Sequence, residues 1–391
     1  MTEAGWQNWS GRVRTTPARL ARPRDAADLA EAVRAAAGDG LAVKAVGATH
    51  SHSPVAATDG LLVDTSALSG LVSVDTRAMT ATVGAGSLIN SLGDDLLSAG
   101  VGLMNQGDID VQSVAGACAT ATHGTGRALQ NLSAAVVGAQ LVTASGQLVS
   151  CSSTEHPDLW AVARTSLGAV GVLTEVTLAV RPAYRLHERL WREDTDAVLA
   201  HLDELVAATR HFELFWFGDG DWCACKSLDE TDEAPGPVEG RRHERVDWSH
   251  RIFPSVRDER HTEMEYAVPA EAGPECFGEI RRLVLDHFAH VAWPVEYRTL
   301  AADDVWMSPA QGRDTVTISV HHDPPPADDR RYYRAAEEIF AAYDGRPHWG
   351  KVHFRPTQEL ARLHPCWEQW WAGRDSWDPD GRFLPADLTS S

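Results

Sequence analysis

Residues 45–53 read AVGATHSHS, and this stretch decides how the N-terminal part of the chain folds. It follows an apolar run at residues 41–43 and precedes a second one at residues 61–63, a pattern that predicts a strand, a tight loop and a strand. Gly47 permits a backbone turn that a Cβ would hinder. Small side chains let backbone N–H groups approach an anion, as phosphate-holding loops require. Because a loop histidine is most often only solvated or hydrogen-bonded, the loop alone does not define a site.

The composition narrows the class of protein. The chain has 391 residues, of which 43% are hydrophobic, so it is long enough for two domains or one large elaborated domain. Its formal net charge of −20 argues against nucleic acid and anionic membranes as general partners. No apolar run reaches the ~18 residues of a transmembrane helix, and the polar N-terminus does not resemble a signal peptide. The six scattered cysteines complete no zinc site, so we expect reduced cysteines, no metal and a cytoplasmic location.

Lysine is rare in this chain, in which arginine supplies almost all the positive charge. The three lysines are Lys44, Lys226 and Lys351. A surface position is the default for a lysine, but one that stands beside other polar candidates is examined further below.

The first hundred residues alternate short strands with helices. The patterns predict helices over residues 25–37 and 88–100, and strands over 41–43, 61–64, 71–75 and 80–83. This order is typical of an α+β unit rather than of the regular βαβ repeat of a dinucleotide fold. The pair Gly84 and Gly86 lacks the third glycine of G-x-G-x-x-G, so a Rossmann reading fails.

Residues 105–126 read NQGDIDVQSVAGACATATHGTG and contain almost only small side chains. Such a segment cannot pack a conventional core, but its backbone can lie against a flat ligand. A loose glycine-rich linker is the alternative, which the alternating Ile109, Val111 and Val114 disfavour. After it the patterns predict strands over 135–143, 147–150 and 170–180, and a helix over 159–167.

At this point the sequence resembles a known family. The segments that carry the resemblance are GATHS at 47–51, GDI at 107–109 with Ala115-Gly116, ATHGTG at 121–126 and LGAVGV at 167–172. Together they resemble the FAD domain of the vanillyl-alcohol oxidase type, and within it the aldonolactone oxidase and alditol oxidase branch. The match covers roughly residues 8–185, with a second match near the C-terminus.

The resemblance implies an α+β fold with three parts. Residues 1–185 would form a two-subdomain FAD-binding domain of the vanillyl-alcohol oxidase type. Residues 186–340 would form a substrate, or cap, domain with an antiparallel sheet covered by helices, an arrangement that the strand and helix patterns there also indicate. Residues 341–391 would return to the FAD domain. Residues 241–270 are not placed by their pattern.

The resemblance also implies how FAD is held. The cofactor would be extended, with its pyrophosphate against the 45–53 loop, and His50 rather than His52 would carry the flavin covalently through its 8α carbon. An imidazole nitrogen can add to that electrophilic carbon, and the bond would make the flavin a stronger oxidant. His123 would hydrogen-bond the backbone of the glycine-rich segment and is not expected to be catalytic. The other residues implied at the cofactor are Gly47, Ala48, Thr49, Ser51, His52, Gly107, Asp108, Ser113, Gly116, Thr120, Gly124 and Val172.

A second group of residues points to the substrate. In a strand over 294–299, Glu296 and Arg298 point to the same side and could hold a hydroxylated substrate, although a plain salt bridge is the commoner meaning of such a pair. The branch carries Glu-x-Arg at this place, so both residues are implied at the substrate site. Lys351 lies in the branch's closing motif, HWGK, whose lysine reaches the active site.

The chain departs from its branch at two positions. At the position where alditol oxidases have a histidine, an ungapped match places Ser319 in this chain. His321 follows two residues later, on the same face of the predicted strand. Where they have a serine that contacts the sugar alcohol, this chain has Asp108, which would change the polarity preferred in a substrate or simply hydrogen-bond the backbone.

The resulting expectation is a flavoprotein oxidase. It would transfer a hydride from a hydroxyl-bearing carbon of a polyol, sugar or aldonolactone to flavin N5, and O2 would be the electron acceptor, yielding H2O2. Lys351 and Arg298 would polarise the substrate hydroxyl, and either a neutral Lys351 or a nearby histidine such as His321 would accept the proton. The alternatives are a dehydrogenase of the same fold and a flavin-binding protein without turnover. The oligomeric state is left open.

Overall fold

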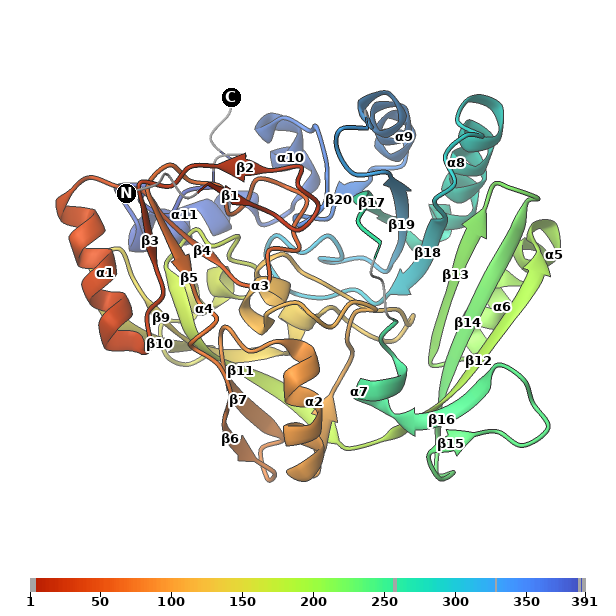
Figure 1. Ribbon diagram of the computed structural model, residues 1–391, viewed down its shortest axis with the longest axis horizontal. Helices are drawn as coiled ribbons and strands as arrows, with labels where there is room; N and C mark the ends of the chain where they lie inside the picture. Colours follow the sequence, from red (N-terminus) through yellow and green to blue (C-terminus); the bar gives the residue numbers. More distant parts are fainter. Residues whose placement is uncertain (1–4, 256–258, 328, 386–387, 389–391) are drawn as a thin grey trace.

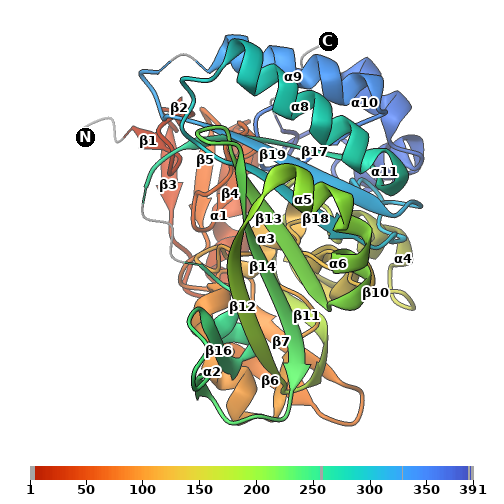
Figure 2. The ribbon, with the colours of Figure 1, turned by 90° about the vertical axis from the view of Figure 1, so that its right-hand side faces the viewer.

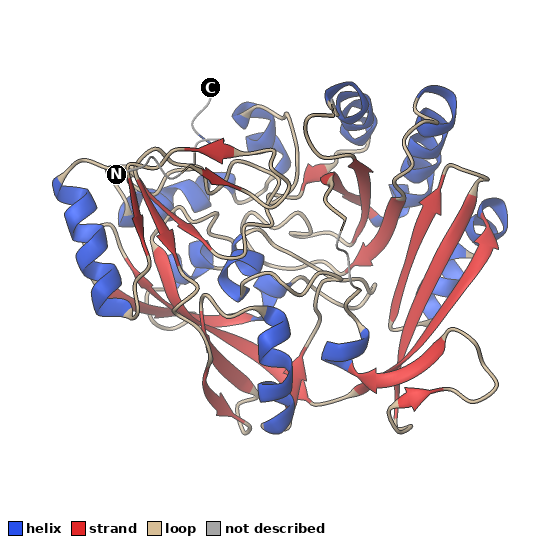
Figure 3. Ribbon diagram, in the orientation of Figure 1, coloured by secondary structure: helices blue, strands red, loops and turns tan. Residues whose placement is uncertain are grey.

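The computed structural model describes residues 5–255, 259–327, 329–385 and 388. Figure 1 shows two bodies side by side, with the N-terminal strands and α1 at one end and a large sheet at the other. Figure 2 shows the large sheet from its own side, with α8 and α9 above it. In Figure 3 a long stretch of loop lies between the two bodies, and this region holds the candidate site.

A small parallel sheet carries the loop at residues 45–53. It has the order β3-β5-β4, formed by Arg19–Ala21, Leu61–Asp64 and Val43–Val46. Helix α1, Ala26–Gly38, packs on it through Leu29 and Val33, and the Asp25 side chain caps its N-terminus by accepting from two backbone N–H groups. The loop after β4 is therefore anchored at both ends by buried parallel strands.

An antiparallel sheet completes the N-terminal body. Its order is β10-β9-β11-β7-β6, and β8 pairs with the far end of β11. The strands are β6 Leu71–Asp75, β7 Thr80–Gly84, β8 Val101–Leu103, β9 Val136–Val142, β10 Leu148–Ser152 and β11 Val172–Pro182. The remaining elements of this body are β1 Trp6–Gln7, β2 Arg14–Thr15, α2 Ile89–Ser98, α3 Val114–Ala119, η1 Leu132–Ala135 and α4 Pro157–Ala163.

A nine-stranded antiparallel sheet forms the second body. Its order is β15-β16-β12-β14-β13-β18-β19-β17-β20. The strands are β12 Arg185–Asp194, β13 His211–Phe217, β14 Trp222–Thr231, β15 Gly236–Pro237, β16 Glu244–Trp248, β17 Thr262–Pro269, β18 Val295–Leu300, β19 Thr315–His322 and β20 Arg346–Pro347. The helices are α5 Thr195–Ala200, α6 Leu202–Ala208, α7 Ser249–Ile252, η2 Ala270–Ala272, α8 Gly273–His287 and α9 Arg330–Ala342.

The period of two along these strands separates an apolar face from a polar one. On β17, for example, Met264 and Tyr266 face the core beneath α8 and α9, whereas Glu263 and Glu265 face the other body. The sheet covered by helices on one face confirms the fold class predicted for the second half of the chain. Its polar face is consequently available to form a site.

The C-terminal helices pack against the N-terminal body. Helix α10 is Thr357–Leu363, and α11, Trp367–Trp377, contacts α4. Trp349, Leu360 and Trp370 belong to the same apolar core as β9 and β11. The proposed division after residue 185 falls at the first residue of β12, while the one after 340 falls within α9.

Two local patterns in the second body give wrong predictions. The amphipathic pattern at 197–209 predicts one helix, but the structure has two, α5 and α6, divided at His201, whose backbone is not helical. The acidic, proline-containing stretch at 229–240 predicts a loop, but it begins inside β14, where Asp229 and Glu230 pair with β12.

Candidate active site

The larger of two neighbouring cavities lies along the loop after β4. Its walls come from three segments far apart in the sequence, at residues 44–56, 112–120 and 166–173. Sequence-predicted residues on its walls are Gly47, Ala48, Thr49, His50, Ser51, Ser113, Gly116 and Thr120. Lys44 also lies on this wall, where its ammonium donates to the Phe383 carbonyl oxygen at 2.8 Å.

The small residues of this cavity are required by close packing. A Cβ on Gly47 would lie 1.9 Å from Ser113 Oγ, and one on Gly116 would lie 2.9 Å from the same atom. Ser113 caps α3 by accepting from the Gly116 N–H, so the loop and the helix start are locked together. The outcome is a long groove bounded by backbone and short side chains, which fits an extended cofactor with a flat ring system.

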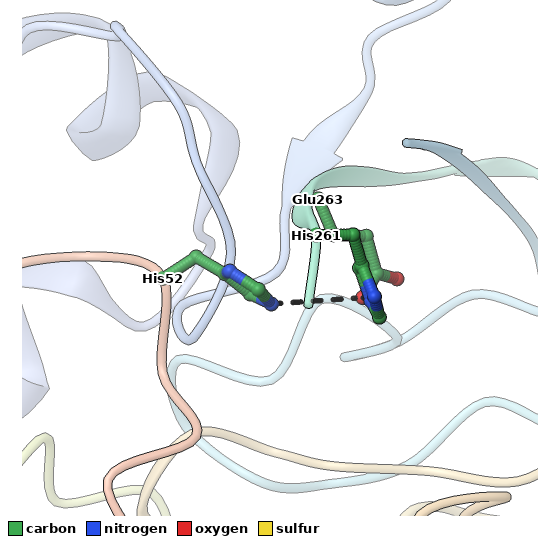
Figure 4. Close-up of side chains that lie close together, drawn as sticks. All are labelled: His52, His261 and Glu263. Atoms are coloured by element: carbon green, nitrogen blue, oxygen red, sulfur yellow. Dashed lines mark ion pairs between the residues drawn. The ribbon is translucent and has the colours of Figure 1, made fainter. Parts of the chain in front are cut away.

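His50 and His52 have different positions, although only one residue separates them. His50 lies on the wall of the larger cavity and stacks on Trp9 with ring centroids 5.1 Å apart. Burial, with Lys351 and His261 nearby, lowers the pKa of His50 to about 4, so its ring is neutral at pH 7. His52 points the other way, and its Nε2 lies 3.9 Å from Glu263 Oε2 (Figure 4).

A second, more polar cavity adjoins the first, and Gln112 lies on the walls of both. It brings together residues from the glycine-rich segment, from strands β17 and β18 of the large sheet and from the loop after β20. Its walls are formed by Gly107, Asp108, Ile109, Gln112, Thr122, His123, Glu263, Glu265, Glu296, Arg298, His348 and Lys351.

The strand register sets the order of the polar groups on the sheet face. Glu296 on β18 pairs with Ser319 on β19, which pairs with Glu265 on β17. Two residues before Glu265 on β17, Glu263 pairs with His321 on β19. Adjacent residues in such a row have side chains about 5 Å apart on one face, so the register alone brings these carboxylates together.

Arg298 and His123 both contact Glu265. Arg298 Nη2 lies 3.0 Å from Glu265 Oε2 and 2.7 Å from Glu296 Oε2. His123 Nε2 lies 2.5 Å from Glu265 Oε1, while its Nδ1 faces the Gly124 carbonyl oxygen at 2.8 Å. Burial raises the pKa of Glu265, but His123 and Arg298 outweigh it and hold that pKa well below its usual range. The hydrogen bond from His123 to the backbone, expected from the sequence, is present. The contact between His123 and Glu265 was not predicted.

Lys351 forms an ion pair with Glu263, at the centre of a cluster of histidines. Figure 4 shows His52 and His261 directed at this carboxylate from different segments, and His321 Nε2 lies 3.6 Å from Glu263 Oε1. Burial raises the pKa of Glu263, but Lys351 and His321 outweigh it and hold the pKa well below its usual range. His52, His261 and Glu263 have the composition of a metal site, but the ammonium of Lys351 already pairs with the carboxylate.

Lys226 forms a third buried ion pair, with Asp108. Its Nζ lies 3.1 Å from Asp108 Oδ1 and 3.0 Å from Glu213 Oε1, and it donates to the Phe253 carbonyl oxygen at 2.8 Å. Burial and the neighbouring Asp108 raise the pKa of Glu213 to about 7, partly offset by Lys226. The Asp108 carboxylate is thus paired with a lysine side chain.

The structure gathers most of the predicted residues, and it adds others. Four predicted residues lie off the walls of these two cavities: His52, Gly124, Val172 and His321. Sequence reasoning missed Glu263 and Glu265, which lie in the unplaced segment 241–270, and gave no role to His348 or Lys226. The alternation in TEMEY at 262–266 was the available indication of a strand with two carboxylates on one face.

The sequence comparisons match this architecture. A model of an FAD binding domain matches residues 17–152, and a D-arabinono-1,4-lactone oxidase model matches residues 176–243 and 236–390. The chain belongs to the D-arabinono-1,4-lactone oxidase family. It is 38% identical to an L-gulono-1,4-lactone dehydrogenase of Mycobacterium tuberculosis, over 97% of each chain. It is 31% identical to an alditol oxidase of a Streptomyces species, over 96% of each, and 27% identical to the L-gulonolactone oxidase of Bos taurus, over 98% of this chain and 97% of that protein.

The fold has a solved counterpart in a cholesterol oxidase from B. sterolicum. The TM-score is 0.85 over 98% of this chain and 96% of that one, at 17% identity, which supports the fold alone. Together with the family assignment, these matches confirm the predicted branch, fold class and cofactor: the chain is an FAD-dependent oxidoreductase acting on CH–OH donors. Among the described residues, no helix has the length and apolar character needed to cross a bilayer.

Proposed function

We propose that this chain oxidises a hydroxyl-bearing carbon of a polyol, sugar or aldonolactone and passes the electrons to O2. The observation that carries the proposal is the junction of the two cavities at Gln112. It joins a groove suited to FAD with a polar chamber that holds Arg298, Lys351 and four carboxylates. The relatives named for lactone and alditol oxidation support the substrate class.

FAD fits the larger cavity, and we assign its covalent attachment to His50. The groove excludes side chains larger than those present, and His50 presents a neutral ring whose nitrogen lone pair is nucleophilic. His52 is directed at Glu263 on the other side of the loop. When bound, FAD supplies the hydride acceptor, and the residues below bind, orient and polarise the substrate.

Arg298 and Lys351 are the cations of the chamber, and both would donate hydrogen bonds to substrate oxygens. Arg298 Nε has no hydrogen-bond partner among the described residues, which leaves an N–H to donate to a substrate oxygen. Lys351 Nζ, paired with Glu263, is placed to stabilise negative charge that develops on the oxygen during hydride loss. Glu296 shares Arg298 and can accept a hydrogen bond from a second hydroxyl.

Hydrogen-bond roles narrow the choice of proton acceptor. His123 faces an oxygen at each ring nitrogen, the Gly124 carbonyl oxygen and the Glu265 carboxylate, so both nitrogens are already engaged within the protein. His348 Nδ1 accepts from the Gly350 N–H at 3.0 Å, which places its proton on Nε2. His321 Nδ1 instead faces the Pro294 carbonyl oxygen at 2.9 Å and must donate, so Nε2 is its basic nitrogen, beside Glu263. We propose His321 as the final acceptor of the hydroxyl proton, which would reach it through Glu263, because Glu263 lies on the cavity wall and His321 lies behind it at 3.6 Å.

Two alternatives remain distinct from an oxidase. One is a dehydrogenase, the description of the Mycobacterium relative, and the other is a flavin-binding protein without turnover. The buried cations and carboxylates of the second cavity argue against the latter, because flavin binding alone does not require them.

Anaerobic titration tests the proposal. The flavin of the purified protein should bleach on addition of L-gulono-1,4-lactone, D-arabinono-1,4-lactone, xylitol or D-sorbitol, and its colour should return with air. Bleaching without rapid return in air, but with return on adding an artificial acceptor, identifies a dehydrogenase. Failure of the whole panel to bleach the flavin would refute the oxidation of polyols and lactones.

A further inference from the structure

The Asp108–Lys226 pair is not explained by cofactor binding or by hydride transfer. Both side chains are buried, and Lys226 is one of only three lysines in the chain. Lys226 comes from β14, two strands away from β18, and reaches across to the glycine-rich segment. Burying an ammonium is costly unless it is paired, so its presence here indicates that an ionised Asp108 is maintained at the cavity wall.

The charges around Asp108 determine which ligands an ionised carboxylate at this position favours. The walls of the polar cavity carry four carboxylates, Asp108, Glu263, Glu265 and Glu296, and two side chains with permanent positive charge, Arg298 and Lys351. With Lys226, which pairs with Asp108 from off the wall, the carboxylates still outnumber the cations. Both wall cations are already engaged with wall carboxylates, Arg298 with two and Lys351 with one. The oxygens of Asp108, Glu213 and Glu296 lie within 4.8 Å of one another. A substrate carboxylate placed here would meet like charges in a buried space.

Thr122 supplies an independent indication that a hydroxylated ligand binds in this chamber. It lies on the cavity wall beside Gly107, it is 7% exposed, and its Oγ1 has no hydrogen-bond partner among the described residues. A buried hydroxyl without a partner costs free energy, which a ligand hydroxyl would recover. A carboxylate offers about four lone-pair positions, so Asp108 can accept from a substrate hydroxyl while it pairs with Lys226.

We propose that Asp108 is a specificity-determining residue and that Lys226 positions it. The Asp108 carboxylate accepts a hydrogen bond from a substrate hydroxyl, and with Glu296 it forms a negative wall that admits neutral polyhydroxyl compounds and rejects carboxylates of the same carbon skeleton. This inference rests on the proposed function, because it names the substrates of the same site. Since aldonolactones hydrolyse in water to aldonates, such a wall would also distinguish a lactone from its own hydrolysis product.

Three compounds of one carbon skeleton test the inference. L-Gulono-1,4-lactone and D-sorbitol are neutral, and L-gulonate carries a carboxylate. Each is titrated into the oxidised, flavin-loaded enzyme under anaerobic conditions, and two quantities are measured: the Kd from the change in flavin absorbance, and the rate of flavin reduction at saturation. We expect gulonate to bind at least ~100-fold more weakly than the better neutral compound, on the scale of an unmatched buried charge.

Asp108→Asn removes the charge at nearly constant volume. It should weaken binding of the neutral compounds by about 10-fold or more and reduce the discrimination against gulonate by at least about 10-fold. Asp110→Asn is the matched control, since Asp110 lies two residues away, half-buried and off the cavity wall, and both quantities should stay within about 2-fold. The double variant Asp108→Asn with Lys226→Met removes both charges and checks that lost discrimination does not arise from an unpaired lysine.

The two proposals fail in different ways. Preferential binding of neutral compounds without flavin reduction would uphold the specificity role and refute the oxidation. Flavin reduction by the neutral compounds with a Kd ratio unchanged in Asp108→Asn would uphold the oxidation and overturn the role of Asp108. Tighter binding of gulonate than of either neutral compound to the wild type would also overturn it.

Discussion

Replacing Lys351 by methionine tests the electrostatic part of the mechanism most directly. The change keeps the approximate length of the side chain and removes the ammonium that pairs with Glu263. If this cation stabilises charge on the substrate oxygen, the limiting rate of flavin reduction should fall by about 10²- to 10³-fold, which corresponds to about 2.7 to 4 kcal/mol of barrier. FAD content should be unchanged, because the proposed attachment is at His50.

The same substitution should also affect stability. Glu263 is 3% exposed and would lose its strongest favourable partner. Removing one member of a fully buried pair costs about 3 to 5 kcal/mol, and the 19% exposure of the Lys351 side chain places the expected loss at or below the lower end. The pairing holds the pKa of Glu263 below its unfolded value, so the stabilisation is present above that value and is lost as the pH falls through the folded one. The cost of Lys351→Met should therefore be largest at neutral pH and shrink in acid.

A double variant separates the two effects. Lys351→Met with Glu263→Gln removes both charges, so it should recover most of the stability while its flavin reduction stays as slow as in the single variant. Anaerobic stopped-flow at saturating substrate gives the rate, and denaturant titration at pH 8 and at a pH below the 4.5 of an unfolded glutamate gives the stability. A single variant that reduces flavin at the wild-type limiting rate would refute the role of Lys351 and leave Arg298 as the cation of the mechanism.

Three further predictions follow from the geometry. His50→Ala should make the flavin removable by acid precipitation, whereas His52→Ala should keep the yellow colour with the protein; retention in His50→Ala contradicts the attachment. By its resemblance to the branch, Gly107 would lie beside the flavin edge that reacts with O2, where a methyl group would block oxygen. Gly107→Ala places a Cβ 3.3 Å from the His123 carbonyl oxygen in a backbone outside the left-handed region, so the variant should fold and should slow reoxidation by O2 far more than reduction by substrate. Equal slowing of both steps rules out such an oxygen gate. Glu213 has a pKa raised to about 7, so the free energy of unfolding should decline as the pH rises from about 4.5 to 7. Glu213→Gln should flatten that decline and stabilise the protein by about 1 to 3 kcal/mol at pH 8. An unchanged slope in denaturant titrations would contradict this role of Glu213.

Local patterns predicted several elements of the N-terminal body. The strand over residues 61–64 and the strand over 71–75 have the predicted bounds, because short apolar runs bounded by turn residues leave little alternative. The loop at 45–53 was recognisable since glycine and small residues are needed where Gly47 meets Ser113. These features depend on neighbours in the sequence, which a single chain displays directly.

The substrate side was predicted only in part, because its contacts depend on strand order. Alternation placed Glu296 and Arg298 on one face, but no local pattern could show that β17 would become the neighbour of β19 and bring Glu265 to the same arginine. Lys226 was conspicuous only for its rarity. Its partner Asp108 lies 118 residues away, and only the folded sheet brings them within hydrogen-bond distance.

The polar face of the large sheet has a consequence for engineering. The cofactor groove is built by the N-terminal body, whereas the sheet's share of the substrate wall consists of alternate positions on β17 and β18, whose other face is fixed by the core under α8 and α9. A library restricted to the cavity-facing positions of these two strands would alter substrate range while the flavin environment and the second core stay intact. Natural divergence among relatives can use the same separation, since side chains on one face of a strand change without disturbing those on the other.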